Sequence, residues 1–76
     1  MEQIILDTLN HAREARKKAF KGIDITGEED YAVAFCEEGW WSAITGLNKQ
    51  SALRIRNSHR KLGRPAVAVD EDDNEV

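Results

Sequence analysis

Apolar residues near the N-terminus recur at the three- and four-residue spacing of a helix. The series consists of Ile5, Leu9, Ala12, Ala15 and Ala19. Strong helix formers stand between these positions, and no helix breaker precedes Gly22. The pattern predicts a first helix over residues 3–21 that ends at Gly22, with a flat alanine strip on which another helix can lie closely.

Three basic residues of the same segment, Arg13, Lys17 and Lys21, are spaced by four and form one edge of the predicted helix. Basic side chains near a helix C-terminus complement the helix dipole. We interpret this edge as a solvated face and not as a binding patch.

The linker at residues 22–27 ends in a start signal for a helix, and a short apolar run follows it. Thr26 and Glu29 have the spacing of a capping box, which marks the beginning of a helix. Residues 31–36 are then apolar on nearly every side. In a short helix this pattern indicates burial against two neighbours, so we expect a second helix at the centre of the core.

Helical phase continues through Gly39 into a tryptophan pair, so one long helix or two helices with a bend both fit. The bend is favoured because adjacent tryptophans point about 100° apart on a helix and are easier to bury where the chain turns. At least one of Trp40 and Trp41 should be buried. Both are candidate contacts for a protein partner, because tryptophan is enriched in interface hot spots.

Strong boundary signals enclose the last predicted helix. Gly46 can adopt the positive φ of a turn, and Asn48 is among the best N-cap residues. The helix should run over residues 49–62, with Gly63 at its C-terminal boundary and Pro65 preventing continuation.

Together these segments predict an all-α fold, a small bundle of three or four short helices over residues 1–65. Residues 66–76 form a tail that begins with four small apolar residues and ends in an acidic stretch, which we expect to be disordered. The apolar residues could dock on the core or add as an edge strand to a partner. With 76 residues the chain makes one domain with a marginal core, which favours a homodimer.

Composition argues against several classes of function. The single cysteine, Cys36, allows no internal disulfide, and ligand groupings for a metal are absent. No pairing of nucleophile and base, phosphate loop or cofactor motif is present, and His59 suits the edge of the core. The longest apolar run has six residues, far below the roughly 20 of a membrane span. We expect a cytoplasmic protein that is not an enzyme and has no metal, cofactor or membrane segment.

Charge is distributed unevenly along the chain. The net charge is −3, yet residues 40–69 contain no Asp or Glu. Six positive residues lie there: Lys49, Arg54, Arg56, Arg60, Lys61 and Arg64. An acidic protein that contains a cationic segment points to a polyanionic or acidic partner.

The helical wheel of residues 49–62 places four polar residues on the face opposite the inward stripe of Ala52, Ile55, His59 and Leu62. They are Gln50, Arg54, Asn57 and Lys61. Gln and Asn can bond adenine in bidentate fashion, Arg can bond guanine, and Lys can bond guanine or phosphate. Lys49, Arg56 and Arg60 flank this stripe, where phosphates lie beside a helix in a major groove.

The stretch Trp41-Ser42-Ala43-Ile44-Thr45-Gly46-Leu47-Asn48-Lys49-Gln50-Ser51-Ala52-Leu53-Arg54-Ile55 resembles the core of helix-turn-helix DNA-binding proteins. The resemblance implies that Ser42 or Ala43 is the small residue at the helix crossing and Gly46 the turn glycine. It also implies that Leu47, Ala52 and Ile55 point inward. It covers about a fifth of the chain, and the family usually has smaller apolar residues where the tryptophans stand.

The leading interpretation is therefore a small helix-turn-helix-like regulator that reads double-stranded DNA with the helix over residues 49–61. The tail could fold back on the basic face and compete with nucleic acid. The alternative is a small helical adaptor or inhibitor, for example of the phage type, that binds a protein through Trp40, Trp41 and the basic helix. The acidic overall charge favours this alternative.

Overall fold

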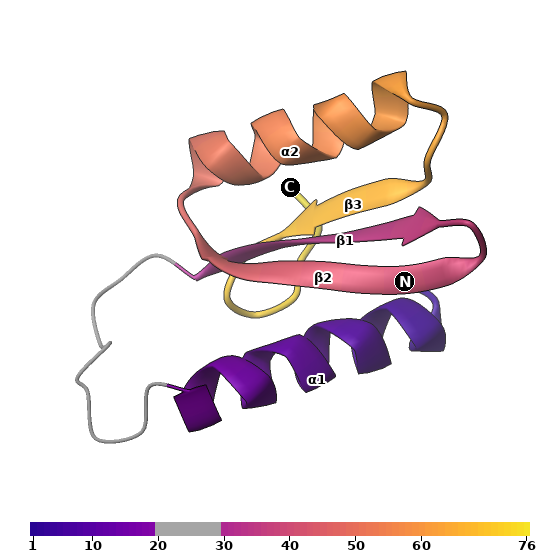
Figure 1. Cartoon of the computed structure of the whole chain (residues 1–76). Coiled ribbons are helices and arrows are strands. Elements are labelled where there is room, and N and C mark those ends of the chain that lie inside the picture. The colour runs from indigo at the N-terminus through magenta and orange to yellow at the C-terminus, as the bar shows by residue number, and fades with distance from the viewer. Residues whose placement is uncertain (20–29) are drawn as a thin grey trace.

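The computed structural model describes residues 1–19 and 30–76 and shows a three-layer α/β/α arrangement. The elements are α1 (Gln3–Ala19), β1 (Tyr31–Glu37), β2 (Trp40–Leu47), α2 (Lys49–Lys61) and β3 (Ala66–Val69). The strands form an antiparallel sheet in the order β2-β1-β3. Helix α1 covers one face of this sheet and α2 covers the other (Figure 1). The prediction of an all-α bundle is therefore wrong.

The apolar run at residues 31–36 is the central strand of the sheet and not a central helix. Ala32 and Ala34 pack in the core on the α1 side, whereas Val33 packs on the α2 side. A strand with both faces covered is apolar at consecutive positions, as a buried helix is, so periodicity does not separate the two. The sequence predicted correctly that this segment is buried but assigned it the wrong secondary structure.

Gly39, where we expected a bend between helices, belongs to a two-residue hairpin turn. Glu38 and Gly39 have φ angles of 52° and 83°, the signs that a type I′ turn requires. Successive residues in the following strand point to opposite faces of the sheet. Trp41 therefore packs against the α1-side core, whereas Trp40 points to the other face and is 79% exposed.

Helix α2 has the boundaries that its sequence predicted. The Asn48 side chain accepts a hydrogen bond from the Ser51 N–H at 2.8 Å and so caps the N-terminus. Gly63 follows the C-cap with a φ of +79°. Ala52 is buried against the sheet. Helix α1 is also confirmed up to Ala19, whereas the predicted end at Gly22 and the predicted capping box lie outside the described residues.

The C-terminal residues are ordered, so the prediction of a disordered tail is wrong. Residues 66–69 form β3, which pairs with β1. The chain then turns, and the Val76 N–H donates to the Ala68 carbonyl at 3.0 Å. The Asp70 carboxylate fixes this turn by accepting the N–H groups of Asp72 and Asn74, each at 2.9 Å. The tail therefore folds back along the outer edge of β3.

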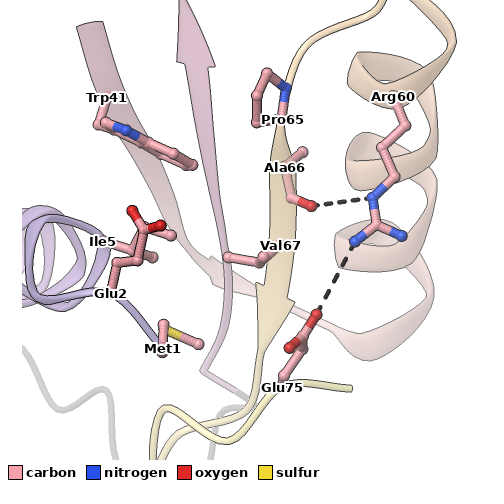
Figure 2. A pocket seen from close by; sticks show the side chains of 9 residues that line it. All are labelled: Met1, Glu2, Ile5, Trp41, Arg60, Pro65, Ala66, Val67 and Glu75. Carbon is pink, nitrogen blue, oxygen red and sulfur yellow. Dashed lines mark hydrogen bonds and ion pairs between the residues drawn. The ribbon is translucent and has the colours of Figure 1, made fainter.

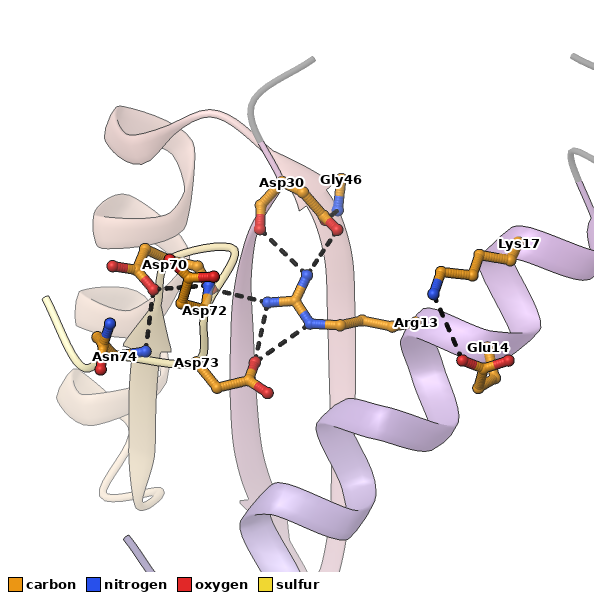
Figure 3. Close-up of polar contacts among 9 residues, drawn as sticks. All are labelled: Arg13, Glu14, Lys17, Asp30, Gly46, Asp70, Asp72, Asp73 and Asn74. Atoms are coloured by element: carbon orange, nitrogen blue, oxygen red, sulfur yellow. Dashed lines mark hydrogen bonds and ion pairs between the residues drawn. The ribbon is translucent and has the colours of Figure 1, made fainter. Parts of the chain in front are cut away.

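Arg13 connects α1 to both the start of β1 and this C-terminal turn (Figure 3). Its guanidinium forms ion pairs with Asp30 at 2.6 Å and with Asp73 at 3.0 Å. It also donates to the Asp70 carbonyl at 2.8 Å. The side chain is only 12% exposed, whereas we expected it on a solvated edge. Lys17, one turn further along, is exposed as expected and lies 3.5 Å from Glu14.

Replacing Arg13 with Ala is expected to lower the free energy of unfolding by about 1–3 kcal/mol, because it removes a largely buried guanidinium from Asp30 and Asp73, whose carboxylates are partly exposed. Urea denaturation followed by tryptophan fluorescence measures the change. Lys17→Ala is the matched control and should cost under about 0.5 kcal/mol, as exposed pairs contribute little. Equal losses in the two variants would show that the Arg13 contacts do not stabilise the fold.

Gly46 has a φ of +72°, as its sequence context predicted, but it lies in a β-bulge and not in a turn between helices.

Gly46→Val should destabilise the fold by about 1 kcal/mol or more, because a β-branched residue is strained at positive φ. An added Cβ would also displace the Arg16 guanidinium. Gly39→Asn is the control, since nothing lies within 4 Å and Asn tolerates this conformation. Thermal melts in which Gly39→Asn loses as much stability as Gly46→Val would contradict the argument.

Candidate nucleic-acid interface

The four side chains of the predicted reading stripe lie together on the solvent face of α2. They are Gln50, Arg54, Asn57 and Lys61, and all four are exposed. The opposite face of the helix packs Ala52 and Ile55 on the sheet. Because the sheet and both helix caps hold α2 in place, these side chains project from a rigid, convex element.

Among the described residues, the cationic side chains of this stripe form no ion pair. In the part of the chain that the structure describes, no carboxylate lies within ion-pair distance of Arg54 or Lys61. The carboxylate of Glu37 instead pairs with Arg64 at 3.0 Å, beyond the C-terminus of α2. The charges of the stripe are therefore available to an external anion.

The predicted flanking residues divide into two kinds. Lys49 is exposed in the first turn of α2. Arg56 donates to the Val76 carbonyl at 2.9 Å. Arg60 donates to the Ala66 carbonyl at 3.0 Å and lies 4.0 Å from the Glu75 carboxylate (Figure 2). The two arginines hold the C-terminal tail, a role that the sequence did not predict because it depends on where β3 lies.

His59 has the edge-of-core environment that its position on the apolar face predicted. Its ring stacks on Phe35 of β1, with centroids 3.9 Å apart and planes inclined by 10°. Its Nδ1 lies 3.4 Å from Arg64 Nη1. These contacts give His59 a structural role between α2 and the sheet.

The two tryptophans do not form one surface. Trp41 lines a hollow on the α1 side together with Ile5, Pro65 and Val67 (Figure 2). Trp40 lies on the α2 side at the end of the hairpin and is exposed. Only Trp40 is therefore available to a partner that also contacts α2.

Within the stretch that resembles helix-turn-helix proteins, Trp41–Leu47 belongs to β2 and only α2 is helical. Ser42 and Ala43 are strand residues, so no first helix crosses α2 at this point. The structure therefore presents α2 as a single helix on a sheet and not as the second helix of a helix-turn-helix pair.

Among residues 1–19 and 30–76, no group of three His, Cys, Asp or Glu side chains is arranged to hold a metal ion. Cys36 is a free, half-buried thiol. In the same residues no helix is long and apolar enough to cross a membrane. Comparisons with protein families, curated proteins and solved structures found no match for this chain.

Lowering the pH is expected to loosen the C-terminal tail, which Arg56 and Arg60 of α2 contact. The Asn74 N–H, followed by that of Asp72, stabilises the Asp70 carboxylate and lowers the pKa of this group below its ordinary value. The stabilisation is present above the unfolded pKa of about 4 and is lost as the pH falls through the lower folded pKa. NMR titration of the Asn74 amide should show a transition below about pH 4 that Asp70→Asn abolishes. A transition that persists in Asp70→Asn would assign it to another group.

Proposed function

We propose that the chain binds double-stranded DNA through the exposed face of α2. The observation that supports this proposal is the joint exposure of Gln50, Arg54, Asn57 and Lys61 on one acid-free helix face. An α-helix fits the major groove of B-form DNA, where Gln, Asn, Arg and Lys can bond base edges. The dimensions and the chemistry of α2 both match that groove.

The scaffold supports this use of α2 in a second way. The helix lies over β1 and β3, and its caps are formed by Asn48 and by the turn at Gly63. A helix fixed at both ends loses little conformational freedom on binding, which favours affinity. Side chains on such a helix also keep their spacing, which favours discrimination between base pairs.

Contacts of the C-terminal tail with α2 limit the strength of DNA binding. Arg56 and Arg60 already contact Val76, Ala66 and Glu75, so phosphate has to compete for them. The net charge of −3 opposes association as well. Binding should therefore be strongly salt-dependent, with its favourable contribution concentrated on the α2 face.

Arg54→Ala is expected to weaken binding to a preferred duplex by about 1–3 kcal/mol and to relax selection at one base pair. The matched control is Lys18→Ala, which removes the same charge from an exposed site on α1, across the sheet. Selection of duplexes from a random pool, followed by anisotropy titrations at several salt concentrations, measures both affinity and selectivity. Equal, small losses in the two variants would contradict a reading role for α2.

One observation favours a second candidate, the binding of a protein partner. Trp40 is exposed on the same side of the sheet as the basic helix, and an exposed tryptophan is a common hot spot. An adaptor would lose its protein partner in Trp40→Ala, by about 2 kcal/mol or more, and would show no sequence selection among duplexes. The duplex titration of the Arg54 and Lys18 variants therefore separates the two functions.

A further inference from the structure

The two edges of the sheet are treated differently by the chain. On β3, the Ala66 carbonyl accepts a hydrogen bond from Arg60 and the Ala68 carbonyl accepts one from the Val76 N–H. These carbonyls point away from β1, so the tail and α2 protect this edge. Protection of an edge strand by its own chain prevents further strand pairing.

The outer edge of β2 has no such protection among the described residues. The Cys36 N–H donates to the Pro65 carbonyl, so the backbone of Cys36 faces β3 and not β2. Its neighbour across the hairpin, Trp41, is therefore in a non-hydrogen-bonded pair, and so is Ala43 opposite Ala34. The N–H and C=O groups of Trp41 and Ala43 consequently point outward, and no described backbone group pairs with them.

One face of β2 is also uncovered. Helix α1 packs over β2 and β1, whereas α2 packs over β1 and β3, so neither described helix covers the α2-side face of β2 (Figure 1). Trp40 and Ile44 lie on this face, 79% and 40% exposed. They stand two positions before and two positions after Ser42, which is also exposed. This symmetric spacing about Ser42 makes the edge complementary to itself.

We propose that β2 pairs with β2 of a second copy of this chain, antiparallel and centred on Ser42. In this register Trp41 of each copy lies opposite Ala43 of the other, and their outward N–H and C=O groups complete two hydrogen-bonded pairs. Trp40 of each copy lies opposite Ile44 of the other, an aromatic and β-branched cross-strand pair. The two sheets then form one continuous sheet. The two copies are related by a two-fold axis, so the assembly stops at a dimer.

The α1 layer fits the same arrangement. With strands about 4.8 Å apart and α1 lying over β2 and β1, the two α1 helices come about 10 Å apart, the distance at which helices pack. A groove beside α1 at this edge is lined by Thr8, His11, Ala12 and Ser42, with Asp7, Trp41 and Ala43. Ile4, on the same helix, is 52% exposed. Antiparallel packing about Thr8 places Ile4 of each copy against Ala12 of the other.

The chemistry of the edge favours a second copy over a charged partner. Residues 40–47 contain no charged side chain, so pairing two identical strands brings no like charges together. The β-bulge at Gly46 lies beyond the paired segment of residues 40–44 and ends it. The reading face of α2 points away from the sheet and stays exposed, so the dimer neither needs nor prevents DNA binding.

The first test is the mass of the full chain in solution. Sedimentation equilibrium should show twice the 8.6 kDa of one chain at high concentration. Ile44→Lys should raise the dissociation constant at least tenfold, because it places two charges on the shared strand pair. Leu62→Lys is the matched control, since Leu62 is the 67% exposed C-cap residue of α2 and lies outside the interface, and it should leave the dissociation constant unchanged. A monomer at about 300 μM, well above the concentration range of stable dimers, or equal weakening by both variants, would overturn the proposal.

The second test determines the register in which the β2 strands of the two copies pair. In a Cys36→Ser background, Ser42→Cys places two thiols across the symmetry axis in a non-hydrogen-bonded pair, about 4.5 Å apart at Cα, within the range of a disulfide. Diamide should convert this variant to a cross-linked dimer within minutes. Ser58→Cys, an exposed thiol on α2, is the control and should stay largely monomeric. Equal cross-linking of both variants, or none in Ser42→Cys, would overturn the register.

Discussion

The guanidinium of Arg13 is the contact on which the arrangement of the layers depends. Its three partner residues belong to two segments: Asp30 immediately precedes β1, and Asp70 and Asp73 lie in the C-terminal turn. Asp30 also accepts the N–H of Gly46 at 2.9 Å, which connects the same point to the bulge in β2. The core consists mostly of small residues, so apolar burial alone gives modest stability. One largely buried cation therefore determines how α1, the hairpin and the tail meet.

The sequence predicted the two helices correctly and the three strands incorrectly, for a physical reason. Asn48, Gly63 and Pro65 act on their immediate neighbours, so the ends of α2 follow from local chemistry. The run of residues 31–36 is apolar because both faces of β1 are covered, and that is a property of the assembled layers. The hairpin signal was weak as well, since Glu38 takes a positive φ where Asn or Asp is usual.

The candidate site was predicted as far as it depends on α2 alone. Gln50, Arg54, Asn57 and Lys61 share a face in any helix with these boundaries, and their exposure followed once the opposite face packed on the sheet. The roles of Arg56 and Arg60 could not be predicted, because their partners Val76, Ala66 and Glu75 reach α2 only through the position of β3. The tryptophan pair was assigned to a helix, whereas the two-residue period of a strand separates Trp40 and Trp41 onto opposite faces.

The offset of the two helices explains how so small a chain can present two separate surfaces. Because α2 lies toward β3, the tail can bond to its flank and close that edge of the sheet. The same offset leaves the α2-side face of β2 without helix cover among the described residues, and Trp40 and Ile44 are exposed there. Within the described residues no carboxylate forms an ion pair with Arg54 or Lys61 of the stripe, although Glu75 and Glu37 pair with Arg60 and Arg64 nearby. The net charge of −3 still opposes association with a polyanion at longer range. The proposed pairing of β2 edges and the proposed contact with a polyanion would therefore use different atoms, so a substitution in one surface can be interpreted without disturbing the other.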